Sequence, residues 1–384
     1  MMYVHVPFCR SFCTYCGFYS EVAPKCRKAE EQRRQQEQTE AFVSALEAEI
    51  ASRKDEIERV FASSDVNTLY IGGGTPSMLP LWAFERLVDA LGRKSYSEFT
   101  VEVNPEDIVE NGPEYVKGLL ALGVNRISMG VQSFDDRILK FMNRRHNAEH
   151  AVEAYRILED AGVDNISIDL IFGLPQLTVP LWQETIGKAL NISAKGTLPK
   201  HISAYQLSIE PDSMLEKLIA QGRFREAPAH QCQQQYDILC EVLSQAGYHH
   251  YEISNFGLPG HEARHNSAYW RNVQYVGLGP GAHSYVGVER SWNVSDLSSY
   301  VSTEDFSAIR SFEMLDEDQM VIERVMLGLR TSQGVEEEFI WAHCDTNAVE
   351  KALGAGSLVR VSQKRMRIPE DRFFISDNII ASII

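Results

Sequence analysis

The sequence lacks the features of a membrane-spanning or exported chain. No apolar run reaches the roughly 18 residues that a spanning helix needs. The first residues do not form a basic segment followed by an apolar run and a small-residue cleavage site, so we predict no signal peptide. Cysteine is scarce: the seven cysteines are an odd number and too sparse for a disulfide scaffold. These absences predict a cytoplasmic protein whose thiols stay reduced.

Basic residues are also fewer than acidic residues. Lys and Arg number 37 against 53 Asp and Glu, which gives a formal net charge of −16. A chain this acidic gains no counterion-release affinity for a phosphate backbone, so nucleic acid is not expected as a partner. The charge does not favour direct binding to anionic lipid either. With 44% hydrophobic and 23% charged residues, the composition is ordinary for a soluble globular protein.

What the sequence does contain is a regular alternation of strand-like and helix-like segments. The strand-like segments are apolar and β-branched, which suits a parallel sheet buried on both faces. Helices are expected around Pro113 to Leu122 and around Ala148 to Ala161, and Gly123 and Gly162 mark their ends. The expected strands are YVHV at Tyr3, VNTLYIGGGTP, FTVEVNP, NRISMGVQSF, NISIDLIFGLP and HISAYQLSIEP. Six β/α units predict an α/β barrel or a doubly wound sheet.

Polar residues collect at the C-terminal ends of five of these strands. One such residue alone is more often a turn residue or a helix cap. Five successive strands that end this way favour a site, because active sites lie at this rim in barrels. The residues are Gly72 to Thr75, Glu102, Asn104, Gln132, Asp169, Tyr205 and Gln206.

The later part of the chain differs in composition and in its expected secondary structure. Residues 247–284 are rich in Gly, His and aromatics and are expected to form strands and loops on the open side of the barrel. Helices followed by a hairpin then predict a small winged-helix-like module. Its basic Lys364, Arg365 and Arg367 are offset by Glu336 to Glu338, which favours a cap or protein-docking module over a DNA reader. The predicted divisions are residues 1–230 for the core, 231–310 for an added substrate-side region and 311–384 for the module.

Three cysteines lie within eight residues in the segment YVHVPFCRSFCTYCGFYS. Cys9, Cys13 and Cys16 have the spacing C-x3-C-x2-C, and soft thiolates select zinc, copper(I) or iron–sulfur clusters. No fourth Cys or His nearby completes a closed zinc site. A [4Fe–4S] cube held by three cysteines leaves one iron open to a small molecule. A redox pair is the other alternative, but C-x2-C alone would serve that purpose.

In its context the spacing resembles the signature of radical S-adenosylmethionine (SAM) proteins. It follows the first strand and has an aromatic residue, Tyr15, before the last cysteine. In that family SAM chelates the open iron, and electron transfer from the reduced cluster yields a 5′-deoxyadenosyl radical. GGGTP, Gly72 to Pro76, resembles the family's loop for the SAM amine, since glycine allows close approach of the backbone. The resemblance implies a partial (β/α)6 barrel.

The resemblance narrows to the subgroup of oxygen-independent coproporphyrinogen III dehydrogenases and heme chaperones of the HemW type. It extends from Tyr3 to about Asn293 and rests on YVHVPFC, GGGTPS, VEVNPE, RISMGVQSF, NRRH, DLIFGLP, YEISNF and HNSAYWRN. It implies that Cys9, Cys13 and Cys16 bind the cluster, and that SAM contacts Tyr3, Tyr15, Gly73, Gly74, Thr75, Glu102, Gln132, Arg144 and Asp169. Glu102 or Asp169 can accept hydrogen bonds from ribose, and Arg144 can pair with the SAM carboxylate.

Two departures favour the chaperone over the dehydrogenase. The dehydrogenase has a further cysteine two residues after the third, where this chain has Phe18. It also has a longer N-terminal segment, whereas this chain starts two residues before Tyr3. The resemblance then implies a protein that binds SAM and heme and passes heme to acceptors such as respiratory enzymes, with peripheral membrane contact and a homodimer. No catalytic residue is predicted.

Two alternatives remain. One is oxidative decarboxylation of coproporphyrinogen III, in which hydrogen abstraction from a propionate and loss of CO2 would leave a vinyl group. The other is a structural or DNA-binding protein with a vestigial cluster, which would leave the residues of the SAM loop without a role.

Histidine supplies the expected heme ligand. HNSAYW, which begins at His265, resembles the heme-associated motif of the chaperones. Neutral imidazole is a common axial ligand, and neighbouring aromatics can shield a porphyrin. A lone histidine is more often a hydrogen-bonded structural residue, but the resemblance favours His265 as the ligand. His249, His250 and His283 are weaker candidates, and His5 is expected to support the cluster site.

The remaining cysteines have no ligand spacing with the cluster: Cys26, Cys232, Cys240 and Cys344. Cys232 and Cys240 lie eight residues apart in a helical stretch and are expected to be packing residues. The polar run from Lys25 to Glu40 is expected to be a solvated helix surface.

Overall fold

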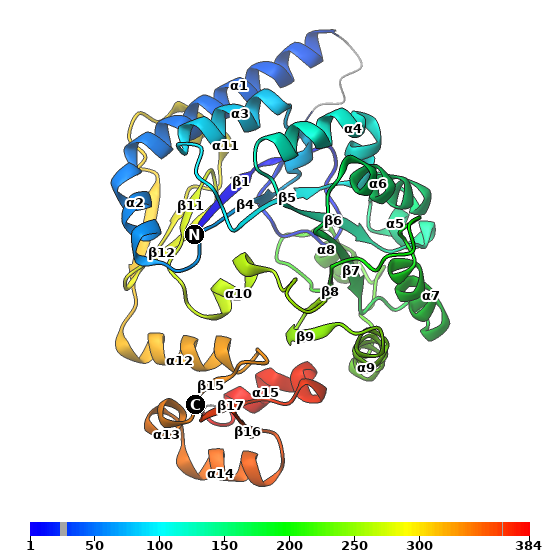
Figure 1. Cartoon of the computed structure of the whole chain (residues 1–384), viewed down its shortest axis with the longest axis vertical. Helices are drawn as coiled ribbons and strands as arrows, with labels where there is room; N and C mark the ends of the chain where they lie inside the picture. The colour runs from blue at the N-terminus through cyan, green and yellow to red at the C-terminus, as the bar shows by residue number, and fades with distance from the viewer. Residues whose placement is uncertain (24–28, 363) are drawn as a thin grey trace.

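The fold is built on one curved and mostly parallel sheet (Figure 1). In the computed structural model, residues 1–23, 29–362 and 364–384 are described. Six parallel strands form the centre of the sheet, in the order β1 (Met2–Val6), β4 (Thr68–Gly73), β5 (Glu98–Val103), β6 (Arg126–Gln132), β7 (Ile166–Phe172) and β8 (His201–Gln206). The predicted partial (β/α)6 barrel is confirmed.

Short strands extend the sheet at both edges and leave it open. β11 (Val276–Leu278) pairs in parallel with β1. At the other edge, β10 (Asn255–Gly257) pairs antiparallel with β8 and with β9 (His249–Glu252). The barrel is therefore partial because these two edges do not pair with each other.

The helices that follow the strands lie around the outside of the sheet (Figure 1). They are α1 (Ala29–Ser52), α2 (Lys54–Ser63), the 3-10 helix η1 (Pro76–Met78), α3 (Leu81–Ala90), α4 (Pro105–Ala121), α5 (Asp136–Phe141), α6 (Ala148–Ala161) and α7 (Val179–Leu190). Phe42, Leu46 and Ile50 of α1 recur every four residues and are buried, as their spacing predicts. Burying each such side chain contributes about 1.5–3 kcal/mol.

Helix ends follow the local sequence. Gly162 ends α6 in a left-handed conformation at φ 100°, as predicted. The helix expected around Pro113 to Leu122 is present as the second part of α4. A first part, which is not expected from the sequence, begins at Pro105, because the Asn104 side chain accepts a hydrogen bond from the Glu106 N–H and proline suits the first helical position. Gly112 interrupts this helix at φ 72°.

Beyond β8 the chain adds helices and a second sheet. These elements are α8 (Met214–Ala220), α9 (Ala229–Gln245), α10 (Arg264–Trp270), β12 (His283–Val286), β13 (Glu289–Asn293), α11 (Leu297–Ser302) and β14 (Arg310–Met314). β12, β13 and β14 form an antiparallel sheet. The HNSAYW segment, expected within strands and loops, is helix α10, and Glu98 of β5 accepts hydrogen bonds from the N–H groups of Arg264 and His265 in its first turn.

The C-terminal module contains the predicted helices and hairpin. They are α12 (Glu317–Gly328), β15 (Val335–Glu336), α13 (Glu337–His343), α14 (Thr346–Gly354), β16 (Val359–Val361), β17 (Arg365–Arg367), η2 (Glu370–Ile375) and α15 (Ser376–Ala381). The three strands form an antiparallel sheet in the order β15-β17-β16, which gives a winged-helix-like arrangement. The domain boundaries at residues 230 and 310 stay a prediction.

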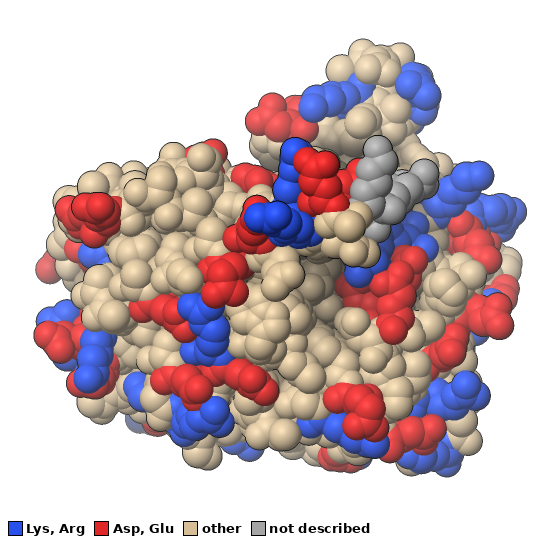
Figure 2. Space-filling model, turned by 90° about the horizontal axis from the view of Figure 1, so that it is seen from above, with Lys and Arg blue, Asp and Glu red and all other residues tan. Residues whose placement is uncertain are grey.

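Charged side chains of both signs are interspersed over the face of the molecule seen in Figure 2, and neither sign forms a continuous patch there. None of the described helices combines the length and the hydropathy that a bilayer crossing requires.

Candidate functional site

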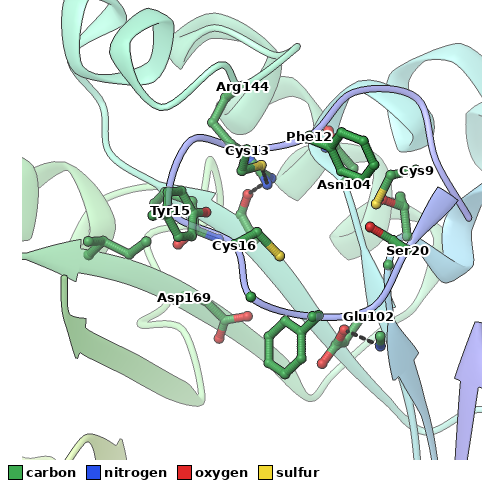
Figure 3. A pocket seen from close by; sticks show the side chains of 18 of the residues that line it. Cys9, Phe12, Cys13, Tyr15, Cys16, Ser20, Glu102, Asn104, Arg144 and Asp169 are labelled. Atoms are coloured by element: carbon green, nitrogen blue, oxygen red, sulfur yellow. Dashed lines mark hydrogen bonds between the residues drawn. The ribbon is translucent and has the colours of Figure 1, made fainter. Parts of the chain in front are cut away.

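A cavity of about 550 Å³ opens at the carboxyl ends of the central strands. Figure 3 shows Cys9, Cys13 and Cys16 around this cavity, with Glu102 and Asp169 on its opposite side. The strand-end rim predicted from the sequence is therefore the wall of one pocket.

The cysteines lie on a loop that is held by a short local strand pair and by two distant segments. The loop starts in β2 (Phe8–Cys9), which pairs with β3 (Glu21–Val22). The Asn143 side chain donates a 2.7 Å hydrogen bond to the Phe12 carbonyl. The Thr14 N–H donates to the Met142 carbonyl at 3.1 Å, and the Leu215 N–H donates to the Thr14 carbonyl at 2.8 Å. Because these bonds come from the regions of α5 and α8, the loop conformation depends on the assembled fold.

The three thiols fit a cluster with three protein ligands. All are free and partly exposed to the cavity. Burial raises the pKa of Cys9 and raises the pKa of Cys16 to about 11, so metal binding would release protons from these thiols. Within the described ranges, no three Cys, His, Asp or Glu side chains converge closely enough to ligate a single metal ion. A [4Fe–4S] cluster binds each thiolate through a different iron, so its ligands need not converge on one point.

The glycine loop GGGTP is shaped by packing inside the protein as well as by its place in the pocket. A Cβ on Gly73, at φ 111°, would lie 2.6 Å from the His5 ring. A Cβ on Gly74 would lie 2.6 Å from the Phe8 carbonyl oxygen. Thr75 completes the loop, with its Oγ1 3.4 Å from the Cys9 sulfur. The glycines therefore bring β4 close against the start of the cysteine loop.

Glu102 projects from β5 and is held at both oxygens. The Tyr70 hydroxyl donates to Oε1 at 2.6 Å, and the Gly73 N–H donates to Oε2 at 3.1 Å. Burial raises the pKa of Glu102 from 4.5 to about 7, against these hydrogen bonds. A carboxylate fixed in this way can still accept hydrogen bonds from ligand hydroxyls in the cavity.

Asp169 projects from β7 into the same cavity. Ser128 Oγ donates to its two oxygens at 3.2 and 3.0 Å, and Ser167 Oγ donates at 3.3 Å. Burial raises the pKa of Asp169, while hydrogen bonding by Ser203 and the charge of Arg126 oppose that rise. Two carboxyl groups therefore line one cavity on neighbouring parts of the sheet.

Arg144 and Gln132 form the side of the cavity near Cys13. Arg144 Nη1 lies 3.5 Å from the Cys13 sulfur, and Nη2 donates to the Gly130 carbonyl at 2.6 Å. Gln132 adopts a left-handed backbone conformation at φ 66°, where the β6–β7 register shifts. A non-glycine residue in this conformation is strained, and such strain is concentrated at functional sites. A Cβ on Gly130 would lie 2.9 Å from the Gln132 side chain, so glycine there makes room for it.

The cavity brings most of the predicted site residues together. Those that line it are Cys9, Cys13, Cys16, Tyr15, Gly73, Gly74, Thr75, Glu102, Gln132, Arg144 and Asp169. Tyr3 does not line it, and its hydroxyl lies 3.1 Å from His5 Nδ1. The SAM contact predicted for Tyr3 would therefore require a larger cavity than this conformation has.

His265 lies outside this cavity and is only 2% exposed. Its Nδ1 lies 2.8 Å from Thr68 Oγ1 and its Nε2 lies 3.1 Å from the Tyr269 hydroxyl. Its role as a heme ligand stays a prediction, and it would require one of these hydrogen bonds to break and the ring to become exposed. His250 is partly buried and stacks on Phe256, with ring centroids 4.1 Å apart.

Several residues of the cavity wall are not predicted from the sequence as site residues. They are Tyr70, Ser128, Arg145 and Glu210. Tyr70 and Ser128 lie within strands, and only strand periodicity, which puts Tyr70 and Gly72 on one face, gives a signal for them.

The other cysteines lie apart from the cavity where they are described. Cys232 is buried in α9, and Cys240 of the same helix is partly buried. Cys344 follows α13 in the C-terminal module. Cys26 and the start of the polar run at Lys25 lie outside the described residues.

Comparisons with known proteins agree on one family. A family model described as the radical SAM superfamily matches residues 3–189. The heme chaperone HemW of Bacillus subtilis (strain 168) is 34% identical over 346 residues, which cover 88% of this chain and 84% of that protein. The heme chaperone HemW of Synechocystis sp. is 34% identical over 377 residues, which cover 94% of this chain and 85% of that protein.

A solved structure has the same fold. Coproporphyrinogen III oxidase (HemN) from Escherichia coli superposes with a TM-score of 0.77 at 22% identity, over 99% of this chain and 89% of that chain.

Proposed function

The chain belongs to the HemW family within the radical SAM superfamily, and from this premise we propose that it binds a [4Fe–4S] cluster, SAM and heme, and delivers heme to acceptor proteins. The observation that carries the proposal is the convergence of three cysteines, a glycine loop, an arginine and two carboxyl groups on one cavity. The same cavity offers soft ligands for a cluster and polar partners for each charged part of SAM.

Each part of the cavity has a distinct role in this proposal. Cys9, Cys13 and Cys16 hold the cluster, which supplies one-electron reduction when bound. Arg144 pairs with the SAM carboxylate, and its Nε is a buried donor that has no partner among the described residues. Glu102 accepts hydrogen bonds from the ribose. Asp169, Gln132, Tyr15 and the glycine loop complete the enclosure of SAM and exclude water.

The mouth of the cavity has exposed aromatic side chains that suit a flat apolar macrocycle. Phe18 is 69% exposed, Phe12 is 54% exposed and Tyr205 is 46% exposed, and all three line the cavity. Exposed aromatic clusters beside a polar pocket are typical of ligand and partner surfaces. The relatives are heme chaperones, so heme is the proposed macrocycle, and this mouth is its proposed contact surface.

The proposed partners are heme-acceptor proteins such as respiratory enzymes, met at the membrane face, and a second copy of the chain. Nucleic acid is not proposed as a partner. The basic side chains of the C-terminal hairpin support this view because they are engaged internally: Arg365 pairs with Glu336, and Arg360 pairs with Glu337 at 2.7 Å. Such pairing leaves less positive charge for phosphate contacts.

Heme loading and transfer test the proposal. The cluster-reconstituted protein should bind heme stoichiometrically in an absorption titration, and the loaded protein should convert a heme-free respiratory cytochrome to its holo spectrum. Phe18→Ser should weaken heme binding, whereas Phe312→Ser, 65% exposed on the distant strand β14, should not. Absence of stoichiometric heme binding by protein with an intact cluster would contradict the proposal.

A further inference from the structure

Tyr70 connects the cavity with the helix of the HNSAYW segment. Its hydroxyl donates to Glu102 Oε1 at 2.6 Å, on the cavity side. Its ring packs against the imidazole of His265 in α10, with centroids 5.1 Å apart and an interplanar angle of 32°. One side chain therefore contacts both a carboxyl group of the SAM site and the histidine that the sequence singles out for heme.

His265 is itself held rigidly in place. Its ring nitrogens are engaged by Thr68 at 2.8 Å and by Tyr269 at 3.1 Å. Its backbone N–H donates to Glu98 at 3.0 Å. Thr68 and Tyr70 are two residues apart on β4, so their side chains lie on the same face of the strand, and α10 packs across that face. A ring fixed at both nitrogens and at its backbone can act as a firm support for its neighbour.

The glycine loop is built around the pair formed by Tyr70 and Glu102. A Cβ on Gly72 would lie 2.7 Å from the Tyr70 ring and 3.0 Å from the Glu102 carboxyl carbon. A side chain at residue 72 would therefore displace one member of the pair. The first glycine of GGGTP thus makes room for this hydrogen bond, a use that differs from close approach to a ligand.

We propose that Tyr70 is a positioning residue for SAM, that it orients the Glu102 carboxylate toward the ribose, and that His265 supports Tyr70 from α10. This inference rests on the proposed function, because it takes SAM as the ligand of the cavity. In this role His265 acts on the SAM site through Tyr70 and does not itself touch SAM. A substitution of His265 in α10 should therefore alter the affinity for SAM.

The electrostatic surroundings of Glu102 make this role measurable. Tyr70 on β4 donates to it and favours its ionised form, Asp169 on β7 opposes ionisation, and Arg126 on β6 favours it. Tyr3 on β1 also faces Glu102, and its hydroxyl stays protonated because burial raises its pKa. Burial lowers the pKa of His265 to about 3, so this ring is neutral. Loss of the Tyr70 donor should therefore shift Glu102 ionisation to higher pH.

The experiment measures SAM affinity against pH for reconstituted wild-type, Tyr70→Phe and His265→Asn proteins whose cluster absorption is intact. Tyr70→Phe keeps the ring on His265 and removes only the hydroxyl. It should weaken SAM binding about tenfold at pH 7, the size expected for loss of a hydrogen bond to a charged group, and move the pH midpoint of affinity upward. His265→Asn should move both quantities in the same direction by a smaller amount.

Tyr248→Phe is the matched control. Its hydroxyl donates to the Pro199 carbonyl at 2.5 Å, and the side chain is buried away from the cavity. It should lose stability like Tyr70→Phe and keep wild-type SAM affinity and pH midpoint. In a Glu102→Gln background, Tyr70→Phe should produce no shift of the pH profile, because the titrating group is gone.

The outcomes separate this inference from the proposed function. If wild-type protein with an intact cluster does not bind SAM, the proposed function fails and the inference fails with it. If wild-type protein binds SAM and Tyr70→Phe has the same affinity and pH midpoint, only the inference is overturned. If Tyr70→Phe does not fold, His265→Asn decides, and wild-type behaviour of that variant overturns the inference.

Discussion

The guanidinium of Arg144 lies 3.5 Å from the sulfur of Cys13, although 131 residues separate them in the chain. The same side chain donates to the Gly130 carbonyl at 2.6 Å, which fixes it between the cysteine loop and β6. A permanent positive charge therefore stands beside the proposed cluster ligand and also faces the cavity.

We expect Arg144→Gln to weaken SAM binding by about tenfold or more, because a hydrogen-bonded pair between charged groups is worth roughly 1.5–3 kcal/mol. Cluster absorption should persist, since the three thiols remain. Equilibrium binding of SAM to reconstituted protein measures the effect. Arg137→Gln is the control, because Arg137 pairs with Asp135 on the surface and is 84% exposed at its side chain. Equal SAM affinities of the two variants would contradict the proposed pairing of Arg144 with the SAM carboxylate.

We expect stable cluster assembly to be abolished when any one of Cys9, Cys13 or Cys16 is replaced by Ala. Each substitution removes one of the three protein ligands of the cluster. Iron and sulfide content after anaerobic reconstitution, together with visible absorption, measures this. Cys344→Ala should reconstitute like the wild type, because Cys344 lies in the C-terminal module. A full iron content in two of the three single variants would contradict the ligand assignment.

The affinity for SAM should rise with pH up to about pH 7 and then level off. Burial raises the pKa of Glu102 to about 7 in the free protein, so this carboxyl is protonated below that pH. Hydroxyl groups that donate to the carboxylate favour its ionised form and lower this pKa, so binding releases a proton. Glu102→Gln should bind more weakly and show no such rise. A wild-type affinity that falls between pH 6 and pH 8 would contradict the role of Glu102.

The stability of the ligand-free protein should change with pH in the direction opposite to the affinity for SAM. A carboxyl whose pKa is raised on folding, from 4.5 to about 7, contributes stability that is fully present below pH 4.5. That contribution is lost as the pH rises through 7. The melting temperature of ligand-free wild-type protein should therefore fall across this window more steeply than that of Glu102→Gln.

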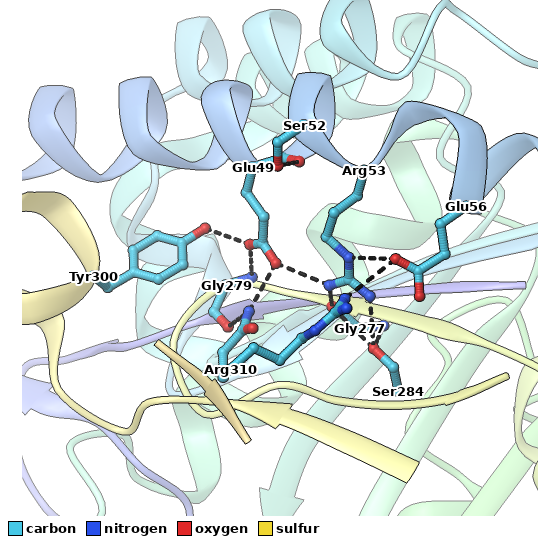
Figure 4. A network of polar contacts seen from close by, with 10 residues as sticks. Glu49, Ser52, Arg53, Glu56, Gly277, Gly279, Ser284, Tyr300 and Arg310 are labelled. Atoms are coloured by element: carbon cyan, nitrogen blue, oxygen red, sulfur yellow. Dashed lines mark hydrogen bonds and ion pairs between the residues drawn. The ribbon is translucent and has the colours of Figure 1, made fainter. Parts of the chain in front are cut away.

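A buried network around the ion pair of Glu49 and Arg53 joins the end of α1 to the later half of the chain (Figure 4). Glu49 is fully buried, pairs with Arg53 at 2.9 Å and accepts a 2.6 Å hydrogen bond from Tyr300. Arg53 also donates to the Gly277 carbonyl at 2.7 Å. We expect Glu49→Ala to lower the free energy of unfolding by about 3–5 kcal/mol. The substitution leaves the buried Arg53 with Glu56 as its remaining ionic partner, and it removes the acceptor of the buried donors of Tyr300 and Asn293.

Denaturant unfolding measures this loss of stability. Glu37→Ala is the control on the same helix, because the Glu37–Arg33 pair has the same spacing but is exposed, at 60% and 80%. It should cost less than about 1 kcal/mol. Similar losses for both variants would show that Glu49 adds nothing through its buried contacts.

The strand-end residues could be predicted because parallel strands bring their carboxyl ends to one edge of a sheet. Glu102 and Asp169 lie about 70 residues apart, yet both line the cavity. A strand-end residue can be a helix cap and a site residue at the same time. Asn104 is an example, because it caps α4 and also lines the cavity.

Other features depend on long-range contacts that the local sequence does not predict. Tyr70 joins the site because Gly72 makes room for its bond to Glu102. The HNSAYW segment becomes a helix because Glu98, more than 160 residues earlier, receives the N–H groups of its first turn. Its histidine faces β4 for the same reason, which the motif alone does not predict.

We propose that this fold carries heme rather than making a heme precursor. Phe18, at the position of the dehydrogenase's additional cysteine, is the residue on which this distinction rests. The most direct measurement is an anaerobic assay of the cluster-reconstituted protein with SAM, a reductant and coproporphyrinogen III, in which protoporphyrinogen is followed by chromatography. We predict no product from protein that binds SAM and one heme per chain. More than one turnover of protoporphyrinogen per chain would contradict the proposed heme-carrier function and identify the protein as a decarboxylase.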